Sequence, residues 1–214
     1  TANTMACVAE AIGLALPGTS AIPATFKERE KTAKLAGKAI MQLIKDGPKP
    51  RDIITRKSLE NATRVVAASG GSTNAALHLP AIAHEAGINF DLFDVMKVFK
   101  TTPYIASMKP SGKYVAKDLY DVGGVPTLMK ALLDGGYLHK NCITVTGKTI
   151  AQNLKSVKFP KNQDVVRETR NPITKSSGLV VLKGSLASQG AVVKVAGMEN
   201  LEFVGKISKE SKKK

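Results

Sequence analysis

The sequence has 214 residues, enough for one large domain, or for one domain and part of another, with a sizeable hydrophobic core. It is 43% hydrophobic and only 5% aromatic, without tryptophan, which is typical of an α/β enzyme core built from small and branched aliphatic residues. Its formal net charge is +15. No apolar run approaches the roughly 18 residues of a membrane span, and no basic segment precedes the apolar residues 5–16. The sequence therefore predicts neither a membrane anchor nor a signal peptide.

The positive charge comes mainly from lysine, with 26 Lys against 6 Arg. Basic proteins often bind nucleic acid by neutralising its phosphates. However, arginine, which forms paired hydrogen bonds to guanine and phosphate, is scarce, and no aromatic residues alternate with the basic ones to stack on bases. The lysines are also spread along the chain. This pattern favours a solvated lysine-rich surface and no nucleic-acid partner, with a small polyanion-binding module acting through the lysine-rich tail, residues 206–214, as the alternative.

The first predicted helix covers residues 5–16 and ends at Pro17-Gly18. Thr25 and Glu28 have the spacing of a capping box, in which each side chain accepts a hydrogen bond from a free N–H at the helix start. The helix that follows should run to about Lys45, before Asp46-Gly47-Pro48. Its apolar residues share one face and should pack against a core: Ala33, Leu35, Ala36, Ile40, Leu43 and Ile44.

Further helices are predicted over residues 58–68, 72–86 and 92–101, and from Pro126 to Leu133. Asp91 and Asp94 should stabilise the start of the third of these through its dipole. Residues 143–145 are either a brief strand or the start of the loop into a short helix over 148–154. Beyond residue 155 the helical periodicity fades, and two β-type runs, 179–182 and 191–195, predict strands joined by a Gly-Ser loop.

The residue types that most often carry chemistry do not form a familiar motif. His78 and His84 are six residues apart on one predicted helix, so they do not share a face, and we expect surface or hydrogen-bonded histidines, His139 included. The two cysteines, Cys7 and Cys142, are too few for a secreted disulfide framework, and we expect small apolar residues in a reduced, cytoplasmic compartment.

Three polar, glycine-bearing turns could bind an anion. Gly147-Lys148-Thr149 is similar to the end of a phosphate-binding loop, but Cys142 stands where that loop needs its first glycine, which disfavours nucleotide binding. Residues 69–74 either offer the free N–H groups of a helix start, near Ser72 and Asn74, to an anion, or form a helix cap on each side of the turn. Residues 109–113, with Lys109 and Ser111, are either an anion-facing loop or an ordinary turn.

The order and spacing of these turns resemble the dihydroxy-acid dehydratases of branched-chain amino-acid synthesis. The likeness is carried by Thr1-Ala2-Asn3-Thr4-Met5 at the start, by residues 69–74, 109–114 and 144–149, and by residues 178–194 (GLVVLKGSLASQGAVVK), and it extends to about Gly205. Such enzymes are lyases that convert 2,3-dihydroxy-3-methyl acids into the 2-oxo acids of valine and isoleucine synthesis. The resemblance implies a cytoplasmic enzyme with a small-molecule dihydroxy-acid substrate and a homodimeric parent.

The resemblance also implies an iron–sulfur cluster and Mg²⁺ as cofactors of that parent. The cluster is held by cysteine thiolates and accepts the departing hydroxyl, while Mg²⁺ orients the carboxylate. In the family, one cluster cysteine stands about five residues before the position of Thr1, and the serine that takes the substrate proton lies beyond the end of this chain. We therefore expect no catalytic or metal-binding residue here, no cofactor bound to this chain alone, and Thr1 and Asn3 near the cluster of the parent.

The expected fold is α/β: part of an α/β catalytic domain followed by the first strands of a β-barrel-type domain. We assign residues 1–160 to the C-terminal half of the catalytic domain, 161–177 to a linker, 178–205 to the start of the β-rich domain and 206–214 to the tail. Because the first residue is Thr1 and not Met, we expect an internal fragment, inactive alone. A fragment of a sugar-acid or 6-phosphogluconate dehydratase is an alternative.

Overall fold

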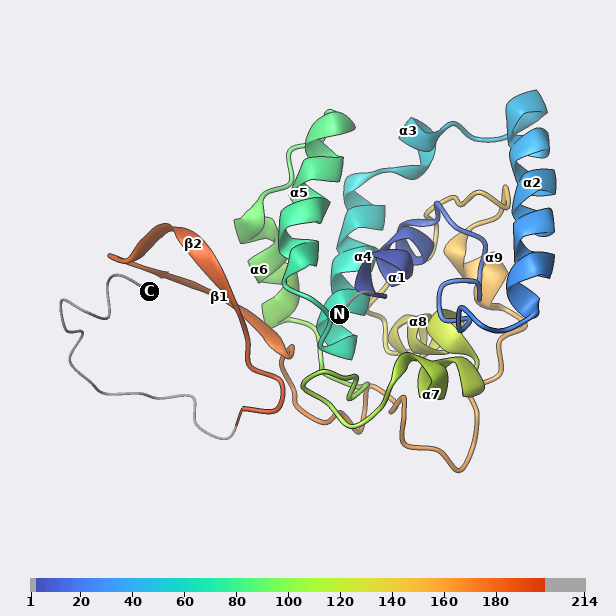
Figure 1. Ribbon diagram of the computed structural model, residues 1–214. Helices are drawn as coiled ribbons and strands as arrows, with labels where there is room; N and C mark the ends of the chain where they lie inside the picture. The colour runs from blue at the N-terminus through green and yellow to red at the C-terminus, as the bar shows by residue number, and fades with distance from the viewer. Residues whose placement is uncertain (1–2, 199–214) are drawn as a thin grey trace.

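A computed structural model describes residues 3–198 of the chain, which contain helices and one small sheet (Figure 1). Thr1 and the lysine-rich tail lie outside the described residues. None of the described helices is long and apolar enough to cross a membrane. The elements are, in chain order, α1 (Thr4–Ile12), α2 (Glu28–Asp46), α3 (Pro50–Ile53), α4 (Arg56–Ser69), α5 (Asn74–Glu85), α6 (Leu92–Lys100), α7 (Ala116–Asp121), α8 (Gly124–Asp134), α9 (Ile150–Leu154), β1 (Leu179–Gly184) and β2 (Ala187–Lys194).

Helix α4 lies at the centre and contacts α1, α5, α6 and α8 (Figure 1). It starts at Thr55, whose hydroxyl accepts a hydrogen bond from the Ser58 N–H, and it ends at Gly70 in the left-handed conformation. Most of its surface is buried, including Leu59, Val65 and Val66. A helix that is apolar on several faces needs neighbours all round, which explains its central place.

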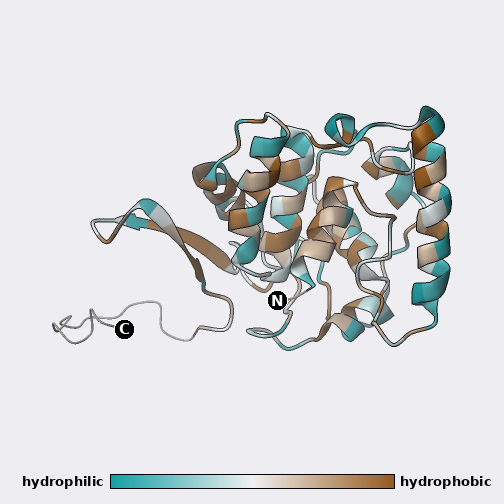
Figure 2. Cartoon of the chain, turned by 45° about the horizontal axis from the view of Figure 1, so that its top comes forward, coloured by the Kyte–Doolittle hydropathy of each residue, from teal (hydrophilic) through white to brown (hydrophobic). Residues whose placement is uncertain are grey.

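Helix α2 departs from its prediction in two respects. Its start, at Lys27, has no side-chain cap, so the predicted capping box of Thr25 and Glu28 is wrong. None of its residues is buried, so the prediction that its apolar face packs against a core is also wrong. Leu35, Ile40 and Ile44 are 56%, 52% and 71% exposed. Figure 2 shows the alternating hydrophobic and hydrophilic segments of this outer helix.

The other predicted helices are present, with shifted ends. Helix α1 ends at Ile12 and not at Pro17, because Gly13 adopts a left-handed φ of 103° and terminates it. Helix α6 starts as expected at Asp91, whose carboxylate accepts hydrogen bonds from two helix-start N–H groups. Pro126 is the third residue of α8 and not its first. Residues 143–145 form a loop with one isolated bridge, from Ile143 to Thr149.

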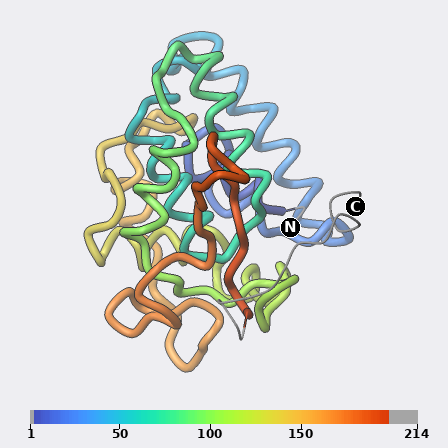
Figure 3. The backbone as a smooth tube through the Cα atoms, turned by 90° about the vertical axis from the view of Figure 1, so that its left-hand side faces the viewer, coloured from blue at the N-terminus to red at the C-terminus, as the bar shows by residue number. Residues whose placement is uncertain are grey.

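The two predicted strands form an antiparallel hairpin (Figure 3, in red). Leu179 pairs with Lys194 at its base, and an irregularity in the register lies between Leu182 and Gly184. The Leu179 side chain is buried in the main core, and β1 contacts α6. The part of the chain that the structure describes thus combines helices with a two-stranded antiparallel sheet.

Candidate functional site

A pocket of about 610 Å³ opens where four segments far apart in the sequence meet. They are the start of α1, the turn between α4 and α5, the loop before α7, and the end of β2. The volume is in the range of small-molecule sites. Most of the wall is apolar, and among the described residues no Asp or Glu lines it. The polar side chains of the wall are those of Asn3, Thr4, Cys7, Ser69, Lys109 and Lys194.

The turn between α4 and α5 depends on glycine. Gly70 has φ +58°, and a Cβ added there would lie 2.9 Å from the Tyr104 ring. A larger residue would therefore have both an unfavourable backbone conformation and a steric clash with that ring. The Ser72 N–H donates to the Thr4 hydroxyl at 3.1 Å, and the Asn74 N–H donates to the Ser72 hydroxyl at 3.2 Å. These N–H groups have partners within the chain; Gly70 caps the end of α4, whereas the start of α5 has no side-chain cap. Neither Ser72 nor Asn74 lines the pocket, and their role in anion binding stays a prediction.

The turn that contains Lys109 is closed by its own backbone. The Lys109 N–H donates to the Tyr114 carbonyl at 2.6 Å, and the Gly112 N–H donates to the Met108 carbonyl at 3.0 Å. These amides are therefore used within the turn, and the side chain of Lys109 is the cationic group that it brings to the pocket. Ser111 belongs to the same turn but is not a lining residue.

Lys194 is a pocket residue that sequence reasoning missed. It ends β2 and is the last residue of the 178–194 motif, but nothing in that motif marks it as a binding residue, because only the packing of the hairpin base brings it to the pocket. That base lies directly on the α4–α5 turn: a Cβ added at Gly178 would be 3.3 Å from the Gly70 Cα. The Gly178 carbonyl accepts a hydrogen bond from the Val195 N–H at 2.9 Å. Burial lowers the pKa of the Lys194 ammonium from its ordinary value.

The described residues of the pocket do not include the ligand set of an iron–sulfur cluster. Cys7 is the one cysteine among its described lining residues. Burial is the main cause that raises the pKa of the Cys7 thiol to about 12, so the group is a thiol at neutral pH. Within residues 3–198, no three His, Cys, Asp or Glu side chains converge as a metal site requires. Asn3, which donates to the Cys7 sulfur at 3.6 Å, lines the pocket, whereas Thr1 lies outside the described residues.

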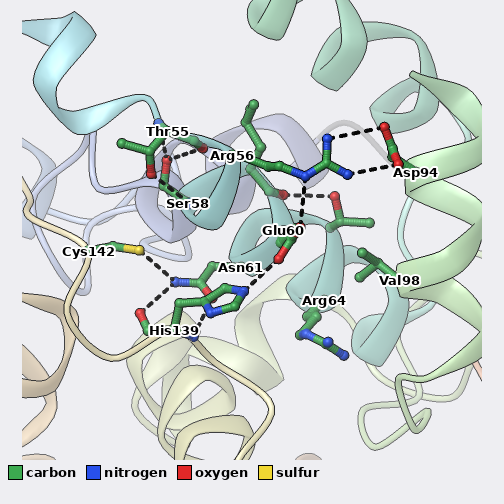
Figure 4. A network of polar contacts seen from close by, with 12 residues as sticks. Thr55, Arg56, Ser58, Glu60, Asn61, Arg64, Asp94, Val98, His139 and Cys142 are labelled. Atoms are coloured by element: carbon green, nitrogen blue, oxygen red, sulfur yellow. Dashed lines mark hydrogen bonds and ion pairs between the residues drawn. The ribbon is translucent and has the colours of Figure 1, made fainter. Parts of the chain in front are cut away.

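His139, in the loop after α8, belongs to a polar network that forms on another part of α4 (Figure 4). Its Nε2 lies 2.6 Å from the Glu60 carboxylate. Glu60 also pairs with Arg56, which in turn bonds the Asp94 carboxylate of α6 at 2.8 Å. The Arg56 hydrogen bond is the main cause that lowers the pKa of Asp94 to about 2. The network therefore joins α4 to α6 and to the loop after α8.

Asn61 completes this network by bonding the backbone of that loop. Its amide donates to the His139 carbonyl at 3.1 Å and accepts from the His139 N–H at 2.8 Å (Figure 4). It also donates to the Cys142 sulfur at 3.6 Å. His139 and Cys142 thus have hydrogen-bonding partners, and His78 and His84 are exposed on α5, as expected for residues with structural or surface roles.

The turn at residues 144–149 uses its amides internally. The Gly147 N–H donates to the Thr144 carbonyl at 2.9 Å, and the Lys148 N–H donates to the Thr146 hydroxyl at 3.2 Å. A phosphate-binding loop needs such N–H groups directed at the ligand. This geometry agrees with the prediction that the turn is not a nucleotide site.

Comparison with known sequences places these features in one family. A family profile described as the N-terminal part of dihydroxy-acid/6-phosphogluconate dehydratases matches residues 1–153, and the corresponding C-terminal profile matches residues 164–209. Dihydroxy-acid dehydratase 2 of Bradyrhizobium diazoefficiens is 64% identical over 205 residues, which are 96% of this chain and 36% of that protein. The dihydroxy-acid dehydratases of Pelagibacter ubique and Saccharolobus islandicus strain M.14.25 are 60% and 51% identical, over 96% of this chain and 36% and 37% of theirs.

The chain therefore spans about a third of the length of the curated relatives that it matches. The N-terminal profile alone covers more than half of the chain, including the start of α1 and the two turns that border the pocket. This chain belongs to the dihydroxy-acid/6-phosphogluconate dehydratase family.

Proposed function

We propose that this chain is a section of a dihydroxy-acid dehydratase, a hydro-lyase that converts 2,3-dihydroxy-3-methyl acids into 2-oxo acids in valine and isoleucine synthesis. The names of the relatives support this proposal, since proteins called dihydroxy-acid dehydratase match 96% of the chain at 51% to 64% identity. The observation that carries it is the pocket, in which Asn3 and Lys109 both line a largely apolar wall. Such a wall suits a small branched acid.

The residues of this chain would bind and orient the substrate. Lys109 is exposed at the pocket and can attract an anionic acid, while the aliphatic wall, with Leu119 and Leu128, can exclude water from the branched end. The reaction removes a proton from C2 and a hydroxyl from C3. Among the described residues of the pocket, none is a carboxylate or histidine placed to take that proton. We therefore assign binding, and no proton transfer, to this part of the chain.

The iron–sulfur cluster and Mg²⁺ that the family resemblance suggests belong to the same proposal for the intact enzyme. The described residues do not fit the cluster, because Cys7 is a thiol of raised pKa and has no second cysteine beside it in the pocket. The ligands would have to come from outside residues 3–198. We also propose a cytoplasmic, homodimeric parent in which residues 1–160 are half of the catalytic domain, 161–177 a linker and 178–205 the start of a β-barrel-type domain, with Ser72, Asn74 and Ser111 near the substrate.

A binding experiment on the chain tests the choice of substrate. NMR titration should show selective binding of 2,3-dihydroxy-3-methylbutanoate over 6-phosphogluconate, the other acid in the family description. Lys109→Met should weaken this binding several-fold. Lys113→Met, in the same turn, is the matched control, because Lys113 pairs with Asp164 and does not line the pocket. Tighter binding of 6-phosphogluconate would favour the alternative substrate class, and dehydration of either acid by the chain alone would contradict the assignment of binding without catalysis.

A further inference from the structure

The end of strand β2 supplies the pocket with a cation that differs from Lys109. Lys109 is exposed, whereas Lys194 is half-buried. Electrostatic interactions are stronger where water is excluded, so a ligand charge would gain more from Lys194 than from a lysine at the mouth. A lysine that loses water also needs a compensating anion.

No counter-ion for Lys194 is present in the described part of the chain. The ion pairs of residues 3–198 do not include Lys194, and no described acidic side chain lines the pocket. Burial is the cause of the lowered pKa of the Lys194 ammonium, and no carboxylate contributes to that shift. The position is thus cationic and partly dry, and none of the acidic residues in 3–198 neutralises it.

The backbone of Lys194 is held in place through its strand partner. Its strand partner, Leu179, is buried in the core, and the Leu179 N–H donates to the Ser177 hydroxyl at 3.0 Å. That hydroxyl donates in turn to the Ala67 carbonyl near the end of α4, at 3.4 Å. Because the backbone that carries this charge is already ordered, binding a ligand there loses less conformational entropy than binding by a lysine on a mobile segment would.

We infer that Lys194 binds the substrate carboxylate, so that the β1–β2 hairpin contributes the selectivity for an acid while the helical part of the pocket contacts the branched carbons. This inference rests on the proposed function, because it assigns one contact within the same site. The ammonium of a flexible lysine side chain can approach either carboxylate oxygen. It can therefore bind the carboxylate of small acids whose side chains differ. Lys109 then attracts the anion towards the mouth.

The test compares 2,3-dihydroxy-3-methylbutanoate with its uncharged methyl ester on the 214-residue chain, by NMR titration. The wild-type chain should bind the acid more tightly than the ester. A hydrogen bond to a charged group corresponds to roughly a tenfold to hundredfold difference in affinity, so Lys194→Met should weaken binding of the acid by about tenfold or more and leave the ester unchanged. Lys194→Arg should restore part of the affinity.

Lys183→Met is the matched control on the same hairpin. Lys183 lies over the Phe93 ring, 5.0 Å from its centroid, and does not line the pocket, so the affinity should stay within twofold of the wild type. If Lys194→Met binds the acid as the wild type does, Lys194 is not the carboxylate partner, although the proposed function stands. If the wild-type chain binds the acid no more tightly than the ester and 6-phosphogluconate, both the inference about Lys194 and the proposed function fail.

A chemical measurement covers the case in which the Met variant does not fold. The acid, but not the ester, should slow acetylation of Lys194 by an N-hydroxysuccinimide ester, read by peptide mass spectrometry, while acetylation of Lys183 stays constant. Equal rates at Lys194 with and without the acid would overturn the inference.

Discussion

Replacement of Asn61 by alanine should strongly destabilise the fold, because it removes a buried member of the network of Figure 4. Asn61 is 0% exposed and bonds both the N–H and the carbonyl of His139, at 2.8 and 3.1 Å. Each such bond contributes about 1 kcal/mol net, and backbone groups left without a partner cost a further 1–3 kcal/mol in total. We therefore expect a loss of about 3–5 kcal/mol in the free energy of unfolding.

Urea unfolding followed by circular dichroism measures this loss. At a slope of about 2 kcal/mol/M, the midpoint should fall by about 1.5–2.5 M. Asn141→Ala is the matched control, because Asn141 is exposed in the same loop, and its midpoint should hardly change. A loss below about 0.5 kcal/mol for Asn61→Ala would refute the reasoning, since it would mean that the loop does not depend on this side chain.

Three further substitutions test individual contacts. Glu10 is 4% exposed, and burial raises the pKa of its carboxyl group above 4.5. The free energy of unfolding should therefore decline as the pH rises through that raised pKa. In a pH series of melting temperatures, Glu10→Gln should flatten this decline. The arginine partner on α4 lowers the pKa of Asp94 to about 2. About 2 kcal/mol of stability should therefore be present above pH 4 and be lost between pH 4 and 2. Asp94→Asn should abolish this loss when unfolding is followed in acid titrations. Gly70→Ala should cost more, by about 1–2 kcal/mol in chemical unfolding, than Gly87→Ala, because both have positive φ but only Gly70 has a close neighbour, the Tyr104 ring; equal costs would show that the ring moves aside.

The helices with strong local signals could be predicted from the sequence. The Asp91 side chain caps α6, and Gly70 ends α4, because these residues act on the backbone beside them. The hairpin strands follow from β-branched runs that need only each other to pair. In contrast, the apolar face of α2 could not be assigned a neighbour, since periodicity shows which residues share a face but not what lies opposite.

The candidate site was predicted only in part. Asn3 and Lys109 line the pocket, and both lie in motifs that the sequence made visible. Lys194 could not be found, because its place depends on the contact between Gly178 and Gly70, more than 100 residues apart. The short helices α3 and α7 were missed for a related reason: four and six residues carry too little periodicity to stand out.

The pocket takes its wall from Asn3 to Lys194, almost the whole described length. During synthesis on a ribosome, α1, α4 and α8 can pack as soon as about residue 134 has emerged, but the binding surface is incomplete until the hairpin follows. A nascent chain that stalls before residue 178 would keep its helical core and Lys109 but lack Lys194, the second cation of the pocket. Release of β2 from the exit tunnel is therefore the step that completes the wall of the pocket.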